Sequence, residues 1–166
     1  LGTSKGGISA LFANCNRGKS SIGLDLKQRA GQKIIKSMIS TADVLIHNYR
    51  PGVMEQLDLG SESLRSENPR LIYTAISGFG TRGPLNNAPA YDPVVQAHVG
   101  FAAMQGTDGP EFIRNMVCDK ITAYTACQAV TAALLVREKT NEGQHIDISM
   151  LDSGLFFLFP DGFMNH

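Results

Sequence analysis

Short apolar segments alternate with helical segments along most of this chain, and this alternation limits the possible folds more than any other feature. Residues 43–47 and 71–76 are nearly continuous apolar runs of the kind found in buried parallel strands. Residues 28–41 carry apolar side chains at helical spacing, and a second helical segment, residues 61–67, separates the two runs. Strands that alternate with helices in this way favour a parallel sheet covered on both faces. The sequence therefore predicts an α/β, Rossmann-like fold with flanking helices.

The remaining segments extend this pattern. Residues 21–26 alternate with period two and are predicted to form the first strand, and residues 146–148 alternate in the same way. Further helices are predicted over residues 94–104, 121–139 and 151–159, the last of them ending at Pro160. No internal repeat or linker divides the sequence, so we expect a single domain.

Composition excludes several classes of partner. The chain has 15 Lys plus Arg and 15 Asp plus Glu, and this balance gives no basic surface for nucleic acid or an anionic membrane. The densest apolar run, residues 155–159, is far shorter than the roughly 20 residues of a membrane-spanning helix. We therefore expect a small-molecule partner, with no nucleic acid and no membrane.

The cysteines and the first residues indicate the setting of the chain. Cys15, Cys118 and Cys127 form an odd set without paired spacing, which is typical of a reducing, cytoplasmic protein. The sequence begins with Leu1 in place of an initiator methionine, and residues 1–7 have the composition of a loop. We expect the chain to begin within a longer protein or after the remnant of a tag.

Two loops should carry the ligand site. Ligands of parallel α/β sheets bind beyond the carboxyl ends of the strands, where residues 48–52 and 77–80 directly follow predicted strands. Gly78, Gly80 and Gly83 have the spacing of a dinucleotide-binding fingerprint, but Pro84 continues the loop where that fingerprint would open a helix. We interpret these glycines as a loop that covers a ligand.

Other candidate chemistry is weaker. The histidines are scattered without the spacing of a metal site, so we expect no bound metal: His47, His98, His145 and His166. Ser77 lacks the upstream glycine of a serine-hydrolase nucleophile elbow. Arg17, Lys19 and Lys27 form a basic cluster that fits either a phosphate contact or a solvated surface.

Asp119 is the strongest single candidate for catalysis. It stands just before the helix predicted at residues 121–139, where a carboxylate commonly caps free N–H groups and stabilises the helix by about 0.5–2 kcal/mol. The same surroundings would keep a nucleophilic carboxylate ionised at neutral pH. A structural cap and a covalent nucleophile are therefore both open from the residues alone.

Four stretches carry a resemblance to one enzyme family. They are NRGKSSIGLDLK at residues 16–27, ADVLIHNYRPGVM at 42–54, NPRLIY and SGFG at 68–73 and 77–80, and REKT and GQHID at 137–140 and 143–147. In this order and spacing, the whole chain resembles the family III CoA-transferases. That family includes formyl-CoA transferases, carnitine CoA-transferases (carnitine dehydratase) and α-methylacyl-CoA racemases.

The resemblance implies a fold and a partner. It implies that residues 1–166 are part of a large, Rossmann-like, coenzyme A-binding domain in an interlocked homodimer. The family's first βα unit and its C-terminal small domain are missing from this sequence, so we expect the chain alone to be inactive. Coenzyme A would take part as a substrate, and no metal is implied.

The resemblance also implies roles for individual residues. Asp119 would be the catalytic nucleophile. The coenzyme A contacts would be Leu24 and Lys27 near the adenosine, Asn48 and Tyr49 along the nucleotide and pantetheine, and Leu57 and Met150 at the flanks. Some family members have Arg where Gln56 stands and Lys where Ser77 stands, which indicates a different acyl substrate or weaker phosphate contacts.

The implied reaction moves coenzyme A between an acyl-CoA and a carboxylic acid, through an aspartyl anhydride and an aspartyl-CoA thioester. One alternative is racemisation by α-proton exchange, in which the family's racemases pair the aspartate with a histidine. Tyr91 stands at the matching position, and its ordinary pKa near 10 makes it a poor replacement. A third alternative is a non-catalytic, CoA-binding fragment.

Overall fold

A parallel sheet of three strands forms the centre of the molecule. The computed structural model describes residues 4–162. In the order β3 (Val44–His47), β4 (Ile72–Ser77) and β5 (His145–Ser149), each strand pairs in parallel with the next, so β4 is central. The short strands β1 (Ser4–Lys5) and β2 (Ile8–Ser9) form a separate antiparallel pair. The predicted α/β class with a parallel sheet is confirmed.

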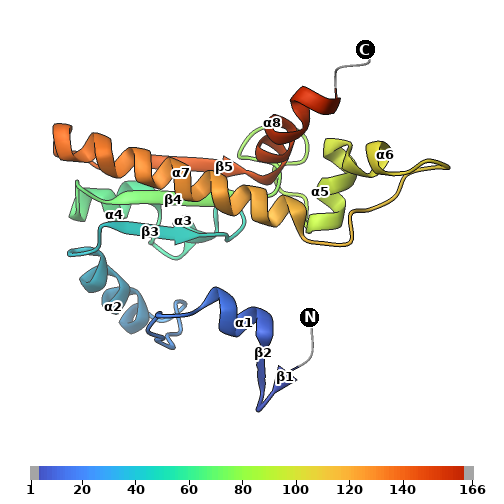
Figure 1. Ribbon diagram of the computed structural model, residues 1–166. Coiled ribbons are helices and arrows are strands. Elements are labelled where there is room, and N and C mark those ends of the chain that lie inside the picture. Colours follow the sequence, from blue (N-terminus) through green and yellow to red (C-terminus); the bar gives the residue numbers. More distant parts are fainter. Residues whose placement is uncertain (1–3, 163–166) are drawn as a thin grey trace.

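Helices cover both faces of the sheet (Figure 1). They are α1 (Ala10–Cys15), α2 (Arg29–Ile39), α3 (Val53–Gln56), α4 (Ser61–Glu67), α5 (Asp92–Val99), α6 (Phe101–Gln105), α7 (Val117–Thr140) and α8 (Met150–Gly162). The long helix α7 crosses in front of β4 and β5 and contacts both strands, whereas α3 and α4 lie behind the sheet. None of the described helices is both long enough and apolar enough to cross a membrane.

Two apolar cores hold these layers together. The first lies between the sheet and helices α2 to α4 and contains Ile39, Met54, Leu59, Leu64, Leu71 and Tyr73. Its three leucines have no exposed surface, and each stabilises the fold by roughly 1.5–3 kcal/mol. The second joins helices α5 to α8 and contains Val95, Val99, Phe101, Cys118 and Leu158. The start of α7 therefore lies where the second core meets the ends of the strands.

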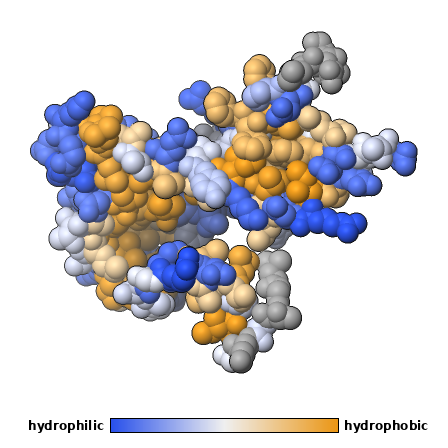
Figure 2. All heavy atoms as spheres, viewed as in Figure 1, coloured by the Kyte–Doolittle hydropathy of each residue, from blue (hydrophilic) through white to orange (hydrophobic). Residues whose placement is uncertain are grey.

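Apolar side chains also gather on the outside of the molecule. Figure 2 shows them over the end formed by α5, α6 and α8. On α8, the side chains of Phe156, Phe157 and Phe159 are 86%, 57% and 62% exposed. Apolar surface of this extent on one element commonly marks a site of association.

Several predicted elements match the structure closely. The helix predicted at residues 61–67 is α4, and the strands predicted at 43–47 and 71–76 are β3 and β4 within one residue. The helix at 28–41 is α2, and the strand at 146–148 is the middle of β5. These segments have strong apolar periodicity and burial on one side, so their local pattern agrees with their packing.

Four predictions about elements are wrong. Residues 21–26 form no strand; they are mostly exposed, and no described strand lies beside them to complete a ladder. The helix predicted at 94–104 is divided into α5 and α6 by Gly100, whose φ of 103° is left-handed. Helix α8 continues past Pro160 to Gly162, although the proline removes one backbone hydrogen bond.

The fourth correction concerns Asp119, which was predicted to precede its helix. Helix α7 begins at Val117, so Asp119 is its third residue and lies in its first turn. Met116 occupies the N-cap position and makes no side-chain cap hydrogen bond. The interpretation of Asp119 as the cap of the helix is therefore wrong.

Candidate active site

The carboxyl ends of the three central strands meet at a cavity of about 570 Å³. Asn48 and Tyr49 follow β3, Ser77 ends β4 with Gly78 directly after it, and Met150 follows β5; all five residues line the cavity. Both loops that the sequence predicted at strand ends therefore contribute to it. A cavity of this size lies within the range that small molecules and cofactors occupy.

The loop after β4 is held tightly against the segment that leads into α5. A side chain at Gly78 would collide with the Cβ of Ala90, so only glycine fits there. The backbone N–H of Gly80 donates to the Ser77 hydroxyl at 3.0 Å, and the N–H of Leu151 donates to the Gly78 carbonyl at 3.0 Å. No helix follows Gly83 before α5, which agrees with the interpretation of this glycine pattern as a loop.

Asp119 lines the same cavity from the start of α7. Its side chain is exposed, yet the surrounding protein partly desolvates the carboxylate; this burial and then the charge of Asp92 raise its pKa above the ordinary value. The positive end of the helix dipole favours the ionised form in this first turn. The carboxylate is thus open to a ligand and more basic than that of a free aspartate.

A second carboxylate lies directly beside this turn, and sequence reasoning gave it no role. Asp92 is 4% exposed, and its Oδ2 accepts the backbone N–H of Asp119 at 2.9 Å. Its Oδ1 accepts a hydrogen bond from Nε2 of Gln96, which is 1% exposed, at 2.5 Å. The sequence carries a local signal for this pair. Asp92 followed by Pro93 is typical of the start of a helix, and Gln96, four residues after Asp92, lies on the same face of that helix.

The thiol next to Asp119 is a poor competing nucleophile. Cys118 is fully buried, and burial, followed by the charges of Asp92 and Asp119, raises its pKa to about 12. Cysteine reacts as the thiolate, which is scarce at neutral pH in this environment. Of these two neighbouring groups, the carboxylate of Asp119 is therefore the one that a ligand can reach.

His47 supports one wall of the cavity. Burial lowers its pKa, which keeps the imidazole neutral, and its Nδ1 accepts the backbone N–H of Tyr49 at 3.3 Å. The rings of His47 and Tyr73 meet edge to face with centroids 5.3 Å apart. These contacts orient the turn that carries Tyr49.

Three of the predicted coenzyme A contacts lie away from this cavity. Leu24 and Lys27 belong to the irregular segment before α2, where Leu24 is half-buried and Lys27 is exposed. Leu57 packs against the core formed with α2 to α4. Tyr91, which the resemblance matched to the histidine of the racemases, is 74% exposed and lines the cavity. The described residues contain no cluster of three or more His, Cys, Asp or Glu that could hold a metal ion.

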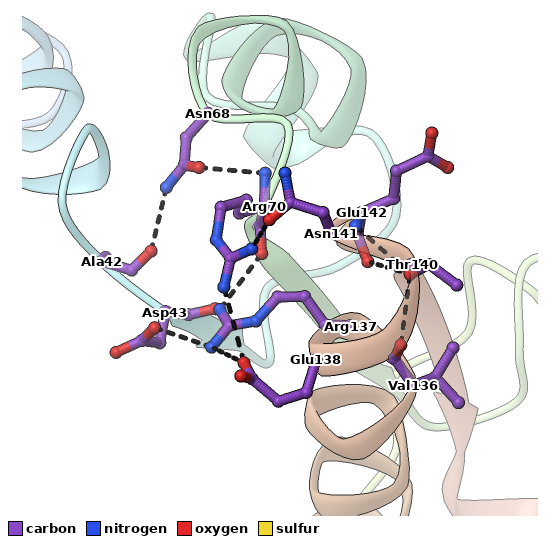
Figure 3. Close-up of polar contacts among 10 residues, drawn as sticks. All are labelled: Ala42, Asp43, Asn68, Arg70, Val136, Arg137, Glu138, Thr140, Asn141 and Glu142. Carbon is purple, nitrogen blue, oxygen red and sulfur yellow. Dashed lines mark hydrogen bonds and ion pairs between the residues drawn. The ribbon is translucent and has the colours of Figure 1, made fainter.

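The far end of α7 is fastened to the beginning of the sheet (Figure 3). Arg137 is 6% exposed, and its Nη2 donates to Oδ1 of Asp43 at 2.9 Å, while its Nη1 donates to the carbonyl of Arg70 at 3.2 Å. Asn68 donates to the carbonyl of Ala42 at 2.9 Å and accepts the N–H of Arg70 at 3.0 Å. This polar cluster joins α7 to the segments that start β3 and β4, so it fixes the helix relative to the strands.

The chain has the architecture of a Rossmann-like α/β domain. Helices lie on both faces of its parallel sheet, and a cavity of ligand size lies at the carboxyl ends of the strands. The sequence profile of CoA-transferase family III matches residues 2–165. The chain belongs to CoA-transferase family III, as its resemblance to that family predicted.

Known relatives agree with this assignment. The chain is 44% identical over 156 residues to an acetyl-CoA:oxalate CoA-transferase of Acetobacter aceti, covering 92% of this chain and 40% of the relative. It is 39% identical over 146 residues to a succinate–glutarate CoA-transferase of Agrobacterium fabrum, covering 87% of this chain and 36% of that protein. A crystal structure of a CaiB/BaiF family protein from Brucella suis superposes with a TM-score of 0.90 at 34% identity, covering 95% of this chain and 42% of the other. The chain thus spans about two fifths of the length of these proteins.

Proposed function

We propose that the protein to which this chain belongs transfers coenzyme A from an acyl-CoA to a carboxylic acid, with Asp119 as the covalent nucleophile. The observation that carries this proposal is the exposed Asp119 carboxylate at the cavity where all three parallel strands end. Membership of CoA-transferase family III supports the reaction class. The inaccessible Cys118 thiol supports the choice of nucleophile.

The proposed reaction conserves the thioester through two kinds of covalent intermediate. The Asp119 carboxylate attacks the thioester carbonyl and expels the coenzyme A thiolate, which leaves a mixed acyl-aspartyl anhydride. The thiolate then attacks the aspartyl carbonyl of that anhydride and releases the first acid as its carboxylate. The product is an aspartyl-CoA thioester.

The second half of the reaction repeats these steps in reverse. The incoming carboxylate attacks the aspartyl thioester, expels the thiolate and forms a new anhydride. The thiolate attacks the new acyl carbonyl, which gives the new acyl-CoA and restores the Asp119 carboxylate. No proton is gained or lost overall, so the site needs preorganised charge stabilisation more than a general acid.

Coenzyme A would extend from this cavity along the ends of the strands. Asn48 and Tyr49 would contact the nucleotide and pantetheine, and Met150 would flank the chain close to Asp119. In this proposal Leu24 and Lys27 meet the adenosine outside the cavity, and Leu57 supports the turn beneath it. No metal takes part.

The acceptor would be a small acid. The names of two relatives include oxalate and glutarate, both dicarboxylic acids. Arg50, which lines the cavity, offers a positive charge for a second carboxylate.

Racemisation is the less favoured reaction, because a phenol at Tyr91 is a weak base at neutral pH. We further propose that the working protein is a homodimer in the cytoplasm.

The test replaces the nucleophile in the full-length natural protein. Asp119→Ala should lower transfer activity on the order of 10³-fold or more, because the covalent route is lost. Hydroxylamine added with acyl-CoA should modify Asp119 in the wild type, as detected by mass spectrometry of peptides. Asp152→Asn, an exposed aspartate in the first turn of α8, serves as the matched control. Unchanged transfer by Asp119→Ala would disprove the proposed function.

A further inference from the structure

The start of α7 is held by a residue from another helix. The backbone N–H groups of a first helical turn need acceptors, and an N-cap side chain usually supplies one to the third residue. Met116 cannot do this, and the N–H of the third residue, Asp119, donates instead to Oδ2 of Asp92 at 2.9 Å. Asp92 is itself the first residue of α5, 27 positions earlier in the chain. A long-range contact therefore replaces the local cap.

Gln96 holds the Asp92 carboxylate in place. Its Nε2 donates to Oδ1 of Asp92 at 2.5 Å and to the carbonyl of Asn115 at 3.0 Å, and its Oε1 accepts the N–H of Ile113 at 2.9 Å. Both side chains are almost completely buried. One turn of α5 therefore fixes the segment that leads into α7 at several backbone atoms.

Burying the Asp92 carboxylate costs free energy of desolvation, so its presence here needs an explanation. Two hydrogen bonds, from the Asp119 amide and the Gln96 side chain, stabilise its charge, and no described cation forms an ion pair with Asp92. A neutral Ser could accept one backbone N–H of the turn with less desolvation. The charge lies directly beside the first turn that carries Asp119, which suggests that it serves this turn.

We propose that Asp92 is a positioning residue for the transfer reaction: its carboxylate, held by Gln96, anchors the Asp119 amide and thereby orients the Asp119 side chain at the cavity. This inference rests on the proposed function, since it assumes that Asp119 is the nucleophile. The Asp119 carboxylate would pass through anhydride and thioester forms, so its own oxygens cannot serve as fixed anchors. Asp92 contacts the backbone of Asp119, and that contact can persist through every step.

The test compares isosteric variants in the full-length natural protein. In Asp92→Asn, one side-chain oxygen becomes an NH₂ donor. If this donor faces the Asp119 amide, the anchor is lost, and if it faces the Gln96 amide, the anchor loses the hydrogen bond that holds it in place. We expect kcat to fall roughly 10- to 100-fold, as a misplaced reacting group predicts. KM for acyl-CoA should change by less than about threefold, because the coenzyme A contacts lie on other loops. Hydroxylamine trapping at Asp119 should slow by the same factor as kcat.

Controls separate positioning from folding and from the identity of the nucleophile. All assays are run well below the melting temperature of each variant, measured by circular dichroism, and Asp152→Asn should match the wild type. Wild-type kcat in folded Asp92→Asn would overturn the inference, while an inactive Asp119→Ala in the same series would leave the proposed function intact. Should Asp92→Asn not fold, a crystal structure of the wild type trapped as its acyl-aspartyl or aspartyl-CoA form decides. The inference requires Asp92 Oδ2 within hydrogen-bond distance of the Asp119 amide, and a separated pair would refute it.

Discussion

Asp119 combines an exposed carboxylate with a charged neighbour, and this combination affects stability as well as chemistry. Partial burial and the charge of Asp92 raise its pKa in the folded state above the ordinary value of 3.8. The folded protein therefore binds this proton more tightly than the unfolded chain does. By linkage, the contribution of this group to stability is fully present below pH 3.8 and is lost as the pH rises through the folded pKa.

The raised pKa of Asp119 predicts that Asp119→Asn melts at a higher temperature than the wild type at pH 7. The rise should be small, on the order of 1 °C, because solvent screens an exposed carboxylate. Below about pH 3.8 the two proteins should melt together. Thermal melts followed by circular dichroism, from below pH 3.8 to pH 7, measure the difference in melting temperature between the two proteins. A lower melting temperature for Asp119→Asn at pH 7 would mean that stabilisation by the helix dipole outweighs desolvation.

At the scale of single residues, the sequence predicted part of the lining of the cavity. The resemblance pointed to Asp119, Asn48, Tyr49 and Met150, and all four line the cavity. It could not reveal that Asp92 holds the Asp119 amide, since this contact joins residues 27 positions apart and depends on how α5 packs against α7. Local patterns describe only neighbours within a turn or a strand.

Among the elements, α7 makes long-range polar contacts at both of its ends. Arg137 reaches the carbonyls of Asp43 and Arg70 and the Asp43 carboxylate, so it joins α7 to the start of two strands. Arg137→Met keeps the apolar stem but removes these charged hydrogen bonds. It should lower the free energy of unfolding by about 2 kcal/mol, measured by urea denaturation. The loss stays moderate because the Asp43 side chain is 75% exposed and regains water.

Arg70→Met is the matched control for this prediction. The side chain of Arg70 is 43% exposed, and its ion pair with Glu138 spans 3.5 Å at the surface. Its loss should cost less than about 1 kcal/mol. Equal destabilisation by the two variants would show that the buried contacts of Arg137 carry no special weight.

The element boundaries that sequence analysis missed have a common physical cause. Residues 21–26 have a strand pattern, but a strand forms only beside a partner, and no described strand pairs with them. The start of α7 was placed too late because residues 114–116, Arg-Asn-Met, leave no capping side chain at the N-cap position, and Asp92 supplies the acceptor from elsewhere. Where the residues that complete an element lie within that element, as in α4, the boundaries predicted from the sequence are confirmed.

On the scale of the whole molecule, the apolar surface of α8 predicts self-association. Phe156 and Phe157 are largely exposed, and an apolar patch of this kind is usually covered by a partner. We expect the chain to be at least dimeric in light scattering at concentrations of tens of micromolar, an order-of-magnitude estimate for a modest apolar interface. Phe156→Asp should shift it towards monomer, because a charge would be buried on association.

Phe112→Asp is the control, since Phe112 is 53% exposed on the loop before α7 and lies outside α8. It should leave the measured mass unchanged. A monomeric wild type would mean that the α8 surface does not bind a second copy of this chain.

The two anchored ends of α7 make the length of this helix a constraint in its own right. Asp119 and Arg137 are eighteen residues apart, about five full turns at 3.6 residues per turn, so both side chains leave the helix on the same side. Deleting one residue near the exposed Gln128 would rotate one end against the other by about 100° and shorten the span by about 1.5 Å. The buried side chain of Arg137 and the cavity-lining side chain of Asp119 could then no longer both occupy their positions. We therefore expect substitutions on the exposed side of α7 to be tolerated far better than insertions or deletions between these two residues.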